Sequence, residues 1–455
     1  MKKIFLLSLL AAGLAGCCNS GQKQVAEQAV WPKLQATGEM PILAWHSIPS
    51  DCTTLERFRE MKETGITHSF TSYPDADAMQ RALDTAQAAG VKLIVSCPEL
   101  EKEPEATVKR FMNHPATAGY FLRDEPNTES FAELGQWAKR IRATDDAHFC
   151  YLNLLPTYAS LEMLKADSYR DYVHRFDQEV PLQLLSFDHY PVVGRTLRPD
   201  YYENLEIFSD EARLAGKPFW AFSLATAHDP YPIPDLAQMR LQMFSNLAYG
   251  AQGLQYFTYW TPGKNPNWNF HHGPIGLDGK RTDVYDKVTE LNREIKALTG
   301  VFLGAKVLSV RHTGDTIPQG TTPLAELPAS VKKLQTTGTG AVVSELQNGD
   351  NRFLVIVNRD FNDRMQLDIE LDPSAKRILK DGSIVPASLY SSTLMVEPGD
   401  AVIYMLQEDE KSTDKYAVAV LCRDAAGGRN PRRPAETAAE GDSDLGLVRH
   451  SGRRS

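Results

Sequence analysis

The segment His114–Asn127, which reads HPATAGYFLRDEPN, joins an apolar run to a group of charged residues. The run Ala118–Leu122 is typical of a buried strand, and two adjacent acids, Asp124 and Glu125, follow it before a proline. If both carboxyl groups face one pocket, like-charge repulsion raises the pKa of Glu125, which suits a general acid, and Arg123 would oppose that rise. The structural alternative is that Glu125 is an acid at the start of a helix, where the helix dipole favours negative charge.

If Glu125 is a general acid, hydrolysis also needs a nucleophile or a base that activates water, and a second carboxyl group could supply either. Asp188 is the first candidate, because it ends another apolar run in the segment SFDHYP. Glu99 and Asp229 are the remaining candidates. The structural alternative for Asp188 is a carboxylate that caps a turn before Pro191.

Other polar and aromatic residues also stand where apolar runs end. Aromatic faces stack on the apolar faces of sugar rings, whereas carboxylates and amides form hydrogen bonds with hydroxyl groups. A carbohydrate is therefore the expected partner. The candidate substrate-binding residues are Trp45, His46, Tyr73, Asp124, Asn153, Tyr190 and Trp260.

A single fold can bring these strand ends together. Between residues 40 and 300, apolar β-type runs alternate with amphipathic helical patterns in about eight units, which predicts a (β/α)8 TIM barrel. Its active site lies at the carboxyl ends of the strands. An open doubly wound sheet shares the alternation, but the glycine-rich fingerprint of a nucleotide-binding version is missing after the first run.

The pattern changes after residue 300. Residues 301–407 alternate apolar and polar side chains between Asn-Gly, Asp-Gly and Pro-Gly turns, which predicts a small antiparallel β-sandwich. The fold class is therefore α/β, a TIM barrel followed by this sandwich. Residues 408–455 lose the pattern, and their composition is typical of a disordered tail.

The amino terminus predicts the compartment. Residues 1–16 combine two lysines with a short apolar run, and the run closes on Leu-Ala-Gly before Cys17. This arrangement resembles the bacterial lipoprotein signal, which implies cleavage before Cys17 and acylation of its thiol; a plain secretory signal is the alternative. We expect a linker over residues 17–39 and a lipid-anchored protein of the bacterial cell envelope.

Charge and cysteine content limit the other partners. The net charge of −9 and the lack of a basic stripe argue against binding to nucleic acid. Cys17 and Cys18 belong to the anchor region, and the other four cysteines are scattered and form no metal-binding or disulfide pattern. We therefore expect no metal site and no cofactor.

The barrel region resembles the retaining (β/α)8 glycoside hydrolases of the large clan that includes β-galactosidases and cellulases. The resemblance is carried by RDEP after the fourth strand and by YFTYW in the eighth. It implies that Glu125 is the acid/base and Trp260 a platform for a sugar ring. The chain departs from the clan twice: Asp124 replaces the usual Asn, and the seventh strand, FWAFSLATAH, lacks the nucleophilic glutamate.

Three functions follow from these features. The first is an extracytoplasmic glycoside hydrolase, and the alternative is a carbohydrate-binding protein on a degenerate hydrolase barrel that lacks the seventh-strand nucleophile. A metal-dependent hydrolase would need histidines at strand ends, whereas His271 and His272 form a pair in a loop.

Overall fold

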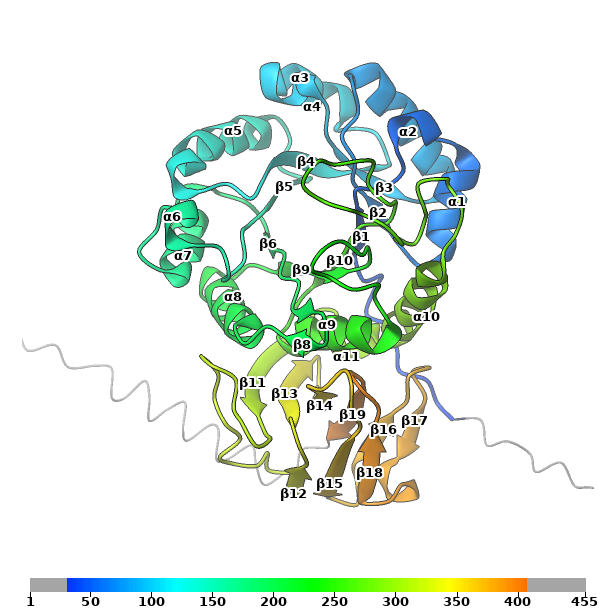
Figure 1. The fold of residues 1–455 in the computed structure, drawn as a ribbon, viewed down its shortest axis with the longest axis vertical. Helices are drawn as coiled ribbons and strands as arrows, with labels where there is room; N and C mark the ends of the chain where they lie inside the picture. The colour runs from blue at the N-terminus through cyan, green and yellow to red at the C-terminus, as the bar shows by residue number, and fades with distance from the viewer. Residues whose placement is uncertain (1–30, 407–455) are drawn as a thin grey trace, which may run out of the picture. The chain divides into compact units, whose positions relative to one another are not determined.

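The computed structural model describes residues 31–406 of the 455-residue chain. Its first part is a barrel of eight parallel strands in the order β5-β4-β3-β2-β1-β10-β9-β6, and a bridge between Leu154 and Phe187 joins the two ends of the sheet. The predicted TIM barrel is confirmed (Figure 1). The strands are β1 (Ile42–Trp45), β2 (His68–Ser69), β3 (Lys92–Val95), β4 (Thr117–Asp124), β5 (Phe149–Asn153), β6 (Leu185–Phe187), β9 (Phe219–Leu224) and β10 (Gly253–Phe257).

Helices surround the strands as an outer ring (Figure 1). Helix α2 illustrates the local rules, because Asp75 caps its first turn by accepting from the backbone N–H of Ala78 at 2.7 Å, and Gly90 ends it with a φ of 71°. The helices are α1 (Leu55–Glu63), α2 (Ala76–Ala89), α3 (Pro98–Lys102), α4 (Pro104–Phe111), α5 (Phe131–Thr144), α6 (Leu161–Leu164), α7 (Tyr169–Glu179), α8 (Tyr201–Ala215), α9 (Leu236–Ala248), α10 (Asp283–Ala297) and α11 (Thr299–Phe302), with short 3-10 turns at Ser50–Cys52, Thr128–Ser130 and Ala387–Leu389.

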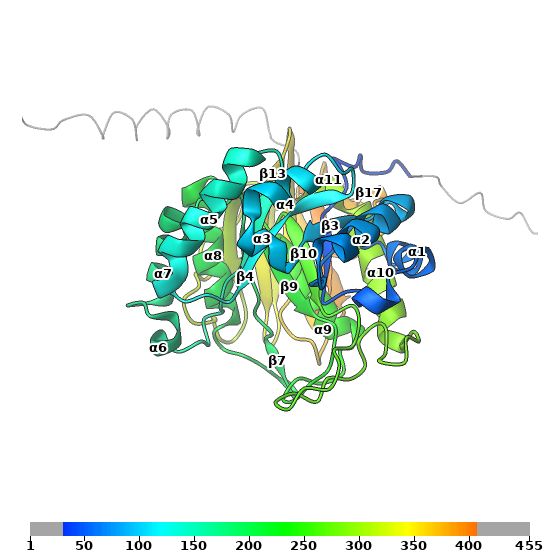
Figure 2. The same cartoon turned by 90° about the horizontal axis from the view of Figure 1, so that it is seen from above.

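Two connections extend from the same end of the barrel, as Figure 2 shows. One carries the short hairpin β7 (Val192–Val193) and β8 (Thr196–Leu197) between β6 and α8, and the other is the long loop between β10 and α10. Because both connections follow strands of the parallel sheet, this is the end at which the fold places its chemistry.

The second part is antiparallel. Its six-stranded sheet has the order β11-β13-β14-β19-β16-β17, and its three-stranded sheet has the order β12-β15-β18, which confirms the predicted sandwich. The Asn-Gly signal works as expected, because Asn348 pairs with Asn351 across a tight turn in which Gly349 has a φ of 58°. The strands are β11 (Lys306–His312), β12 (Val331–Thr336), β13 (Ala341–Asn348), β14 (Asn351–Asn358), β15 (Met365–Leu371), β16 (Lys376–Ile378), β17 (Ile384–Pro386), β18 (Thr393–Val396) and β19 (Ala401–Leu406).

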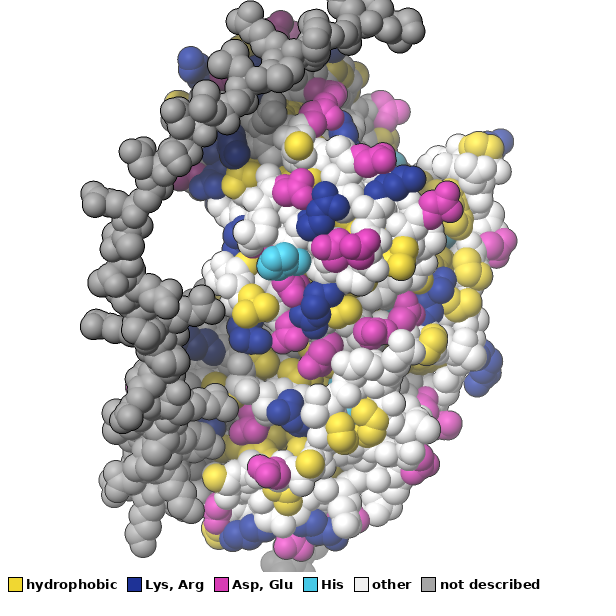
Figure 3. Space-filling model, turned by 90° about the vertical axis from the view of Figure 1, so that its left-hand side faces the viewer, with side chains coloured by type: hydrophobic (Ala, Val, Ile, Leu, Met, Phe, Trp, Pro, Cys, Tyr) yellow, Lys and Arg dark blue, Asp and Glu magenta, His cyan; other side chains and the backbone are white. Residues whose placement is uncertain are grey.

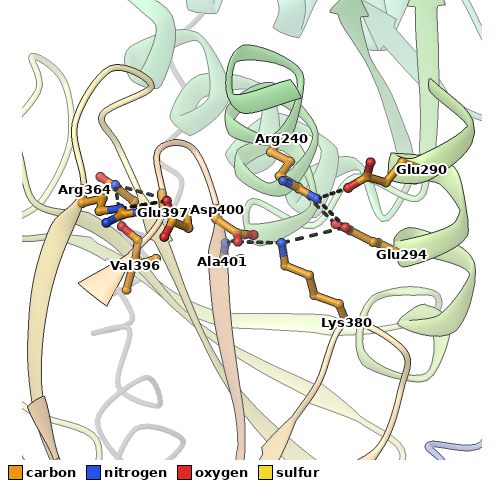
Figure 4. Close-up of polar contacts among 10 residues, drawn as sticks. Arg240, Glu290, Glu294, Arg364, Lys380, Val396, Glu397, Asp400 and Ala401 are labelled. Carbon is orange, nitrogen blue, oxygen red and sulfur yellow. Dashed lines mark hydrogen bonds and ion pairs between the residues drawn. The ribbon is translucent and has the colours of Figure 1, made fainter. Parts of the chain in front are cut away.

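The sandwich packs against helix α9 of the barrel. Ser344 of β13 donates a hydrogen bond to the carbonyl of Ala248 at 2.7 Å, and Gly399 is so close to α9 that a Cβ there would lie 2.0 Å from the carbonyl oxygen of Ala237. A chain of ion pairs crosses the same contact (Figure 4). We call this chain the junction network; it consists of Arg240, Glu290, Glu294, Lys380 and Asp400.

The face drawn in Figure 3 carries positive and negative side chains interspersed with one another. Oppositely charged side chains on and beside the outer helices form ion pairs. Arg170 lies 2.8 Å from Glu211, and Arg142 lies 2.7 Å from Asp146. Within residues 31–406, no helix has the length and apolar character to cross a membrane. The predictions for residues 1–30, including Cys17, and for the tail lie outside the described residues.

Candidate active site

The end of strand β4 departs from regular strand geometry. The pairing of β4 with β5 shifts register between Phe121 and Asp124, and Glu125 has a φ of 45°, in the left-handed region that residues other than glycine rarely occupy. In a regular strand Asp124 and Glu125 would point to opposite faces. Here Asp124 pairs with Asn153 of β5 and the backbone N–H of Glu125 donates to the carbonyl of Asn153 at 2.9 Å, so both acids stand beside the end of β5, and the charge of Glu125 raises the pKa of Asp124.

Asp188 joins them from the end of β6. Its carboxyl group forms a hydrogen bond with that of Glu125. Asn153, at the end of β5, donates from Nδ2 to Oδ1 of Asp188 at 2.8 Å and also forms a hydrogen bond with Asp124. Two carboxyl groups can form a hydrogen bond only if one of them keeps its proton, so Glu125 and Asp188 share one. We call Asp124, Glu125 and Asp188 the acid group.

All three carboxyl groups of the acid group bind their protons more tightly than usual. Burial, followed by the charges of Glu125 and Asp124, raises the pKa of Asp188 well above its ordinary value, and burial also raises the pKa of Glu125. Burial and the charge of Glu125 raise the pKa of Asp124 to about 7, although its hydrogen bond with Asn153 acts in the opposite direction.

The side chains of the acid group differ in their access to solvent. Asp188 is only 7% exposed, whereas Asp124 and Glu125 have solvent-accessible surface although protein surrounds them closely enough to raise their pKa values. This combination describes a recess that is open on one side. A substrate can therefore reach Asp124 and Glu125, with Asp188 behind them.

A buried hydrogen-bond chain fixes Asn153. Ser186 of β6 donates to Oδ1 of Asn153 at 2.9 Å, and Gln255 of β10 donates to Ser186 at 2.8 Å. Tyr151 donates in turn to the side-chain oxygen of Gln255. Because Oδ1 of Asn153 is already occupied by a donor, its Nδ2 group must face the acid group, which orients the amide for Asp188.

Three tyrosines and an arginine line the recess. Tyr190 is 7% exposed and lies 5.8 Å from the ring of Tyr231. Arg198 lies 4.3 Å above the ring of Tyr158 and donates a hydrogen bond to the hydroxyl of Tyr231 at 3.3 Å. Burial and then the charge of Asp188 raise the pKa values of Tyr158 and Tyr190, which places both rings beside the acid group. Arg198 and Tyr231 lie in connections after β6 and β9, where no strand-end pattern marks them.

Two other predicted residues, Trp45 and Tyr73, pack in the hydrophobic core. Trp45 is 8% exposed and belongs to the inner core of the barrel, where its ring lies 4.3 Å from Phe70. Tyr73 is part of the outer core and lines a separate cavity of about 230 Å³ together with Trp137. His46 has a φ of 43°, and burial lowers the pKa of its imidazole.

Trp260 does not stand free at the mouth. Its indole is 5% exposed and packs in the outer core, with the guanidinium of Arg57 5.1 Å from the ring centre. No ring face is left for a sugar, which corrects the expected platform. The exposed tryptophan at this end is Trp268, which is 45% exposed in the loop between β10 and α10 and lines a cleft of about 530 Å³ with Asp229 and Phe270.

The other candidate carboxylates are separate from the acid group. Asp229 accepts a hydrogen bond from Asn269 at 2.9 Å, and Glu99 lies in the first turn of α3. Neither is among the charges that shift the pKa values of Asp124, Glu125 and Asp188. Residues 219–228, which form β9 and its continuation, contain no Asp or Glu.

Arg123 also differs from expectation. Its guanidinium lies 3.9 Å from the carboxylate of Glu133 on α5, and it is not among the groups that act on the pKa of Asp124 or Glu125. The register shift in β4 directs it away from the recess. Within residues 31–406, no group of three or more His, Cys, Asp and Glu side chains is arranged to hold a metal ion.

Comparison with known proteins agrees with this architecture. Residues 138–298, about a third of the chain, match the family Glyco_hydro_42, described as Beta-galactosidase. No curated protein sequence matches this chain.

Among solved structures, a GH42 β-galactosidase from G. stearothermophilus has a TM-score of 0.54 at 8% identity, covering 83% of this chain and 100% of that one. The β-galactosidase from Bacillus circulans sp. alkalophilus has a TM-score of 0.52 at 9% identity, covering 81% of this chain and 99% of that one. The β-galactosidase from the psychrophilic Marinomonas ef1 has a TM-score of 0.51 at 10% identity, covering 81% of this chain and 100% of that one. The chain thus shares the fold of these barrel glycosidases, and its segment 138–298 carries the family's sequence pattern.

Proposed function

We propose that this protein hydrolyses glycosidic bonds and that Glu125 is the general acid. The observation that carries the proposal is the hydrogen-bonded pair of Glu125 and Asp188 at the strand ends of a glycosidase-type barrel, where Asn153 also donates to Asp188 at 2.8 Å. A general acid must hold a proton near neutral pH and be accessible to the leaving oxygen. Burial raises the pKa of Glu125, although its hydrogen bond with Asp188 acts in the opposite direction, and this rise serves the first requirement; the exposure of Glu125 meets the second. The Glyco_hydro_42 match over residues 138–298 supports a carbohydrate as the substrate.

The hydrogen bond between Glu125 and Asp188 also bears on the role of Asp188. The two carboxyl groups of a retaining glycosidase lie about 5–5.5 Å apart and those of an inverting enzyme about 6.5–9.5 Å apart. A hydrogen bond between carboxyl groups brings their oxygens to roughly 2.5–2.7 Å, which leaves no room for a sugar between them. Asp188 therefore fits a positioning role, in which its hydrogen bond orients the carboxyl group of Glu125, better than the predicted role of nucleophile or base.

The test is Glu125→Gln, which keeps the shape of the side chain and removes the transferable proton. General acid catalysis is worth roughly 100- to 10,000-fold, so kcat/KM on glycosides with a poor leaving group should fall by about that factor. Nitrophenyl glycosides need less protonation and should lose less. Equal activity of the wild type and the variant on an unactivated glycoside would contradict the assignment.

One observation favours a second function, a carbohydrate-binding protein on a hydrolase barrel. Residues 219–228 supply no carboxylate where the resemblance implies the nucleophile. Aromatic and acidic side chains around the recess would serve binding equally well. Calorimetric titration of an oligosaccharide panel that reveals binding without any cleavage would favour this reading over the hydrolase.

We further propose that the protein is anchored in the bacterial cell envelope through an acylated Cys17. The sequence Leu-Ala-Gly-Cys after a short apolar run motivates this proposal. Wild-type protein should incorporate labelled fatty acid and fractionate with membranes, and Cys17→Ala should do neither. Retention of the label by the variant would exclude Cys17 as the acylation site.

A further inference from the structure

We propose that the substrate is an N-acetylated amino sugar whose own acetamido group is the nucleophile, and that Asp124 holds the N–H of that group. This inference rests on the proposed glycosidase activity and names its substrate class. Its starting point is that residues 219–228, which form β9 and its continuation, supply no carboxylate where the resemblance implies the nucleophile. In substrate-assisted glycoside hydrolysis the protein needs no such carboxylate.

The geometry of the acid group separates two tasks. The backbone N–H of Glu125 donates to the carbonyl of Asn153 at 2.9 Å, and Asn153 donates to Asp188 at 2.8 Å, which holds Glu125 beside Asp188 as the general acid. Asp124 is the remaining carboxyl group, and it lies next to Glu125 with solvent-accessible surface. Above its raised pKa of about 7, Asp124 is a carboxylate and accepts hydrogen bonds only, so in that form it suits an amide N–H on the substrate.

The left-handed backbone conformation of Glu125 allows Glu125 and Asp124 to act in the same recess, one as the acid and the other as the acceptor of the amide N–H. Regular strand alternation would bury one of the two adjacent acids away from the other. The register shift before Asp124 and the left-handed φ of Glu125 direct both carboxyl groups to Asp188 instead. Such backbone strain is retained at functional sites.

The wall of the recess fits the acetyl group. Tyr158 is 37% exposed and lies within range of the charge of Asp188, so its ring is the accessible one; Tyr190 and Tyr231 are nearly buried, and Arg198 contacts both Tyr158 and Tyr231. Ring faces pack against a methyl group, and phenolic hydroxyls donate to a carbonyl oxygen. This combination matches an acetamido group better than it matches a single hydroxyl.

The chemical steps balance without a further reagent. The acetamido oxygen forms a bond to the anomeric carbon as the bond to the glycosidic oxygen breaks, and Glu125 gives its proton to that leaving oxygen. Asp124 stabilises the positive charge that develops on the amide. Water then attacks the anomeric carbon, gives a proton back to Glu125 and opens the oxazoline ring, so the sugar keeps its original anomeric configuration.

The experiment compares matched nitrophenyl β-glycosides that carry either a 2-acetamido group or a 2-hydroxyl group, in the gluco and galacto configurations, with purified full-length protein. Intramolecular nucleophiles reach effective molarities of about 100,000 M and above, so the 2-hydroxyl substrates should be cleaved at least ~1,000-fold more slowly. Replacing N-acetyl by N-trifluoroacetyl weakens the carbonyl oxygen as a nucleophile and should slow cleavage markedly.

The outcomes separate this inference from the proposed function. Cleavage of 2-hydroxyl substrates at an equal or greater rate would overturn the inference and leave the glycosidase activity standing. Cleavage of the acetamido substrates without any effect of fluorination would overturn it as well. If no glycoside of either set is cleaved, the proposed function itself fails.

A variant gives an independent test. Asp124→Asn replaces an acceptor by a group that also donates, so kcat on the acetamido substrate should fall by about 10- to 100-fold, the value of a charged hydrogen bond. Asp146→Asn is the matched control, because Asp146 is a surface residue paired with Arg142. Equal kcat for Asp124→Asn and Asp146→Asn would exclude Asp124 from this role.

Discussion

Two groups of partly buried charges in this molecule are built on opposite principles. The junction network alternates signs: Arg240, with a side chain 14% exposed, pairs with Glu290 at 2.8 Å and also with Glu294, and Lys380 pairs with Asp400 at 2.6 Å (Figure 4). The acid group places three carboxyl groups together, and none of the interactions that shift their pKa values involves Lys or Arg.

The two groups therefore respond differently to burial. Burial lowers the pKa of Arg240, but the hydrogen bond and charge of Glu294 outweigh it and the pKa rises, which keeps the charge in place. In the acid group, burial and like charge act in the same direction, so protons stay bound instead. Compensated charges of this kind hold parts of a structure together, whereas uncompensated ones are typical of sites that move protons.

Breaking the junction network should give the largest effect on stability. Arg240→Ala leaves Glu294, which is 8% exposed, without its arginine. Removing one partner of a buried pair destabilises a protein by about 3 kcal/mol or more, because the other charge stays buried. The measurement is the free energy of unfolding in urea at neutral pH.

The matched control for Arg240→Ala is Arg364→Ala. Arg364 pairs with Glu397 at 3.0 Å, but both side chains are more than half exposed, at 62% and 53%. Exposed pairs contribute about 0–1 kcal/mol, so this variant should unfold close to the wild type. Similar losses in the two variants would mean that the junction network does not differ from an ordinary surface pair.

Neutralising Asp188 of the acid group should stabilise the protein, whereas Arg240→Ala destabilises it, and it should lower the activity. In Asp188→Asn, the new amide N–H can donate to Glu125 at every pH, which favours the ionised form of Glu125, so its pKa falls and the alkaline limb of the pH–kcat/KM profile moves to lower pH. Above the new pKa the activity falls about tenfold per pH unit. The oxygen of the new amide still accepts from Asn153, which preserves the local hydrogen bond. An unshifted alkaline limb would contradict the shared proton.

The sign of the stability change follows from linkage. The pKa of Asp188 is raised in the folded protein, so the folded state binds the proton more tightly than the unfolded chain. Wild-type stability from this group is full below the ordinary aspartate pKa of about 4 and is lost as the pH rises through the folded value. The amide introduced by Asp188→Asn does not titrate, so the thermal midpoint of the variant should exceed that of the wild type at pH 8 by more than it does at pH 5.

The sequence predicts some features of the molecule and not others. The barrel, the sandwich and the meeting of Glu125 with Asp188 and Asn153 follow from strand patterns, because parallel strands end at one edge. Side-chain directions beyond the strand ends do not follow, since they depend on loop backbone. Trp260 was expected to face a sugar, and it lies under Arg57 instead.

The residues that sequence reasoning missed share a physical cause. Tyr231 and Arg198 reach the recess from long connections, where no hydrophobic period fixes their position. The register shift in β4 that turns Arg123 toward Glu133 carries no local signal either. The junction network is equally invisible in the sequence, because α9 and Lys380 are far apart along the chain.

The smallest expected effect concerns the edge of the cleft. Trp268 is 45% exposed, lies 5.4 Å from the ring of His228 and lines the cleft with Asp229. If a sugar stacks on it, Trp268→Ala should weaken binding by about 1 kcal/mol, a roughly fivefold rise in Kd, and leave the unfolding free energy nearly unchanged because little apolar surface is lost from the core. Tyr390→Ala is the control: Tyr390 is 39% exposed in the sandwich under Arg377, so its loss should not change the Kd. Titration of an oligosaccharide into Glu125→Gln, which binds without turning over, gives the Kd for both variants in that background. An unchanged Kd for Trp268→Ala would mean that Trp268 does not bind the sugar. The residues of the recess around the acid group would then be the ones that select the substrate.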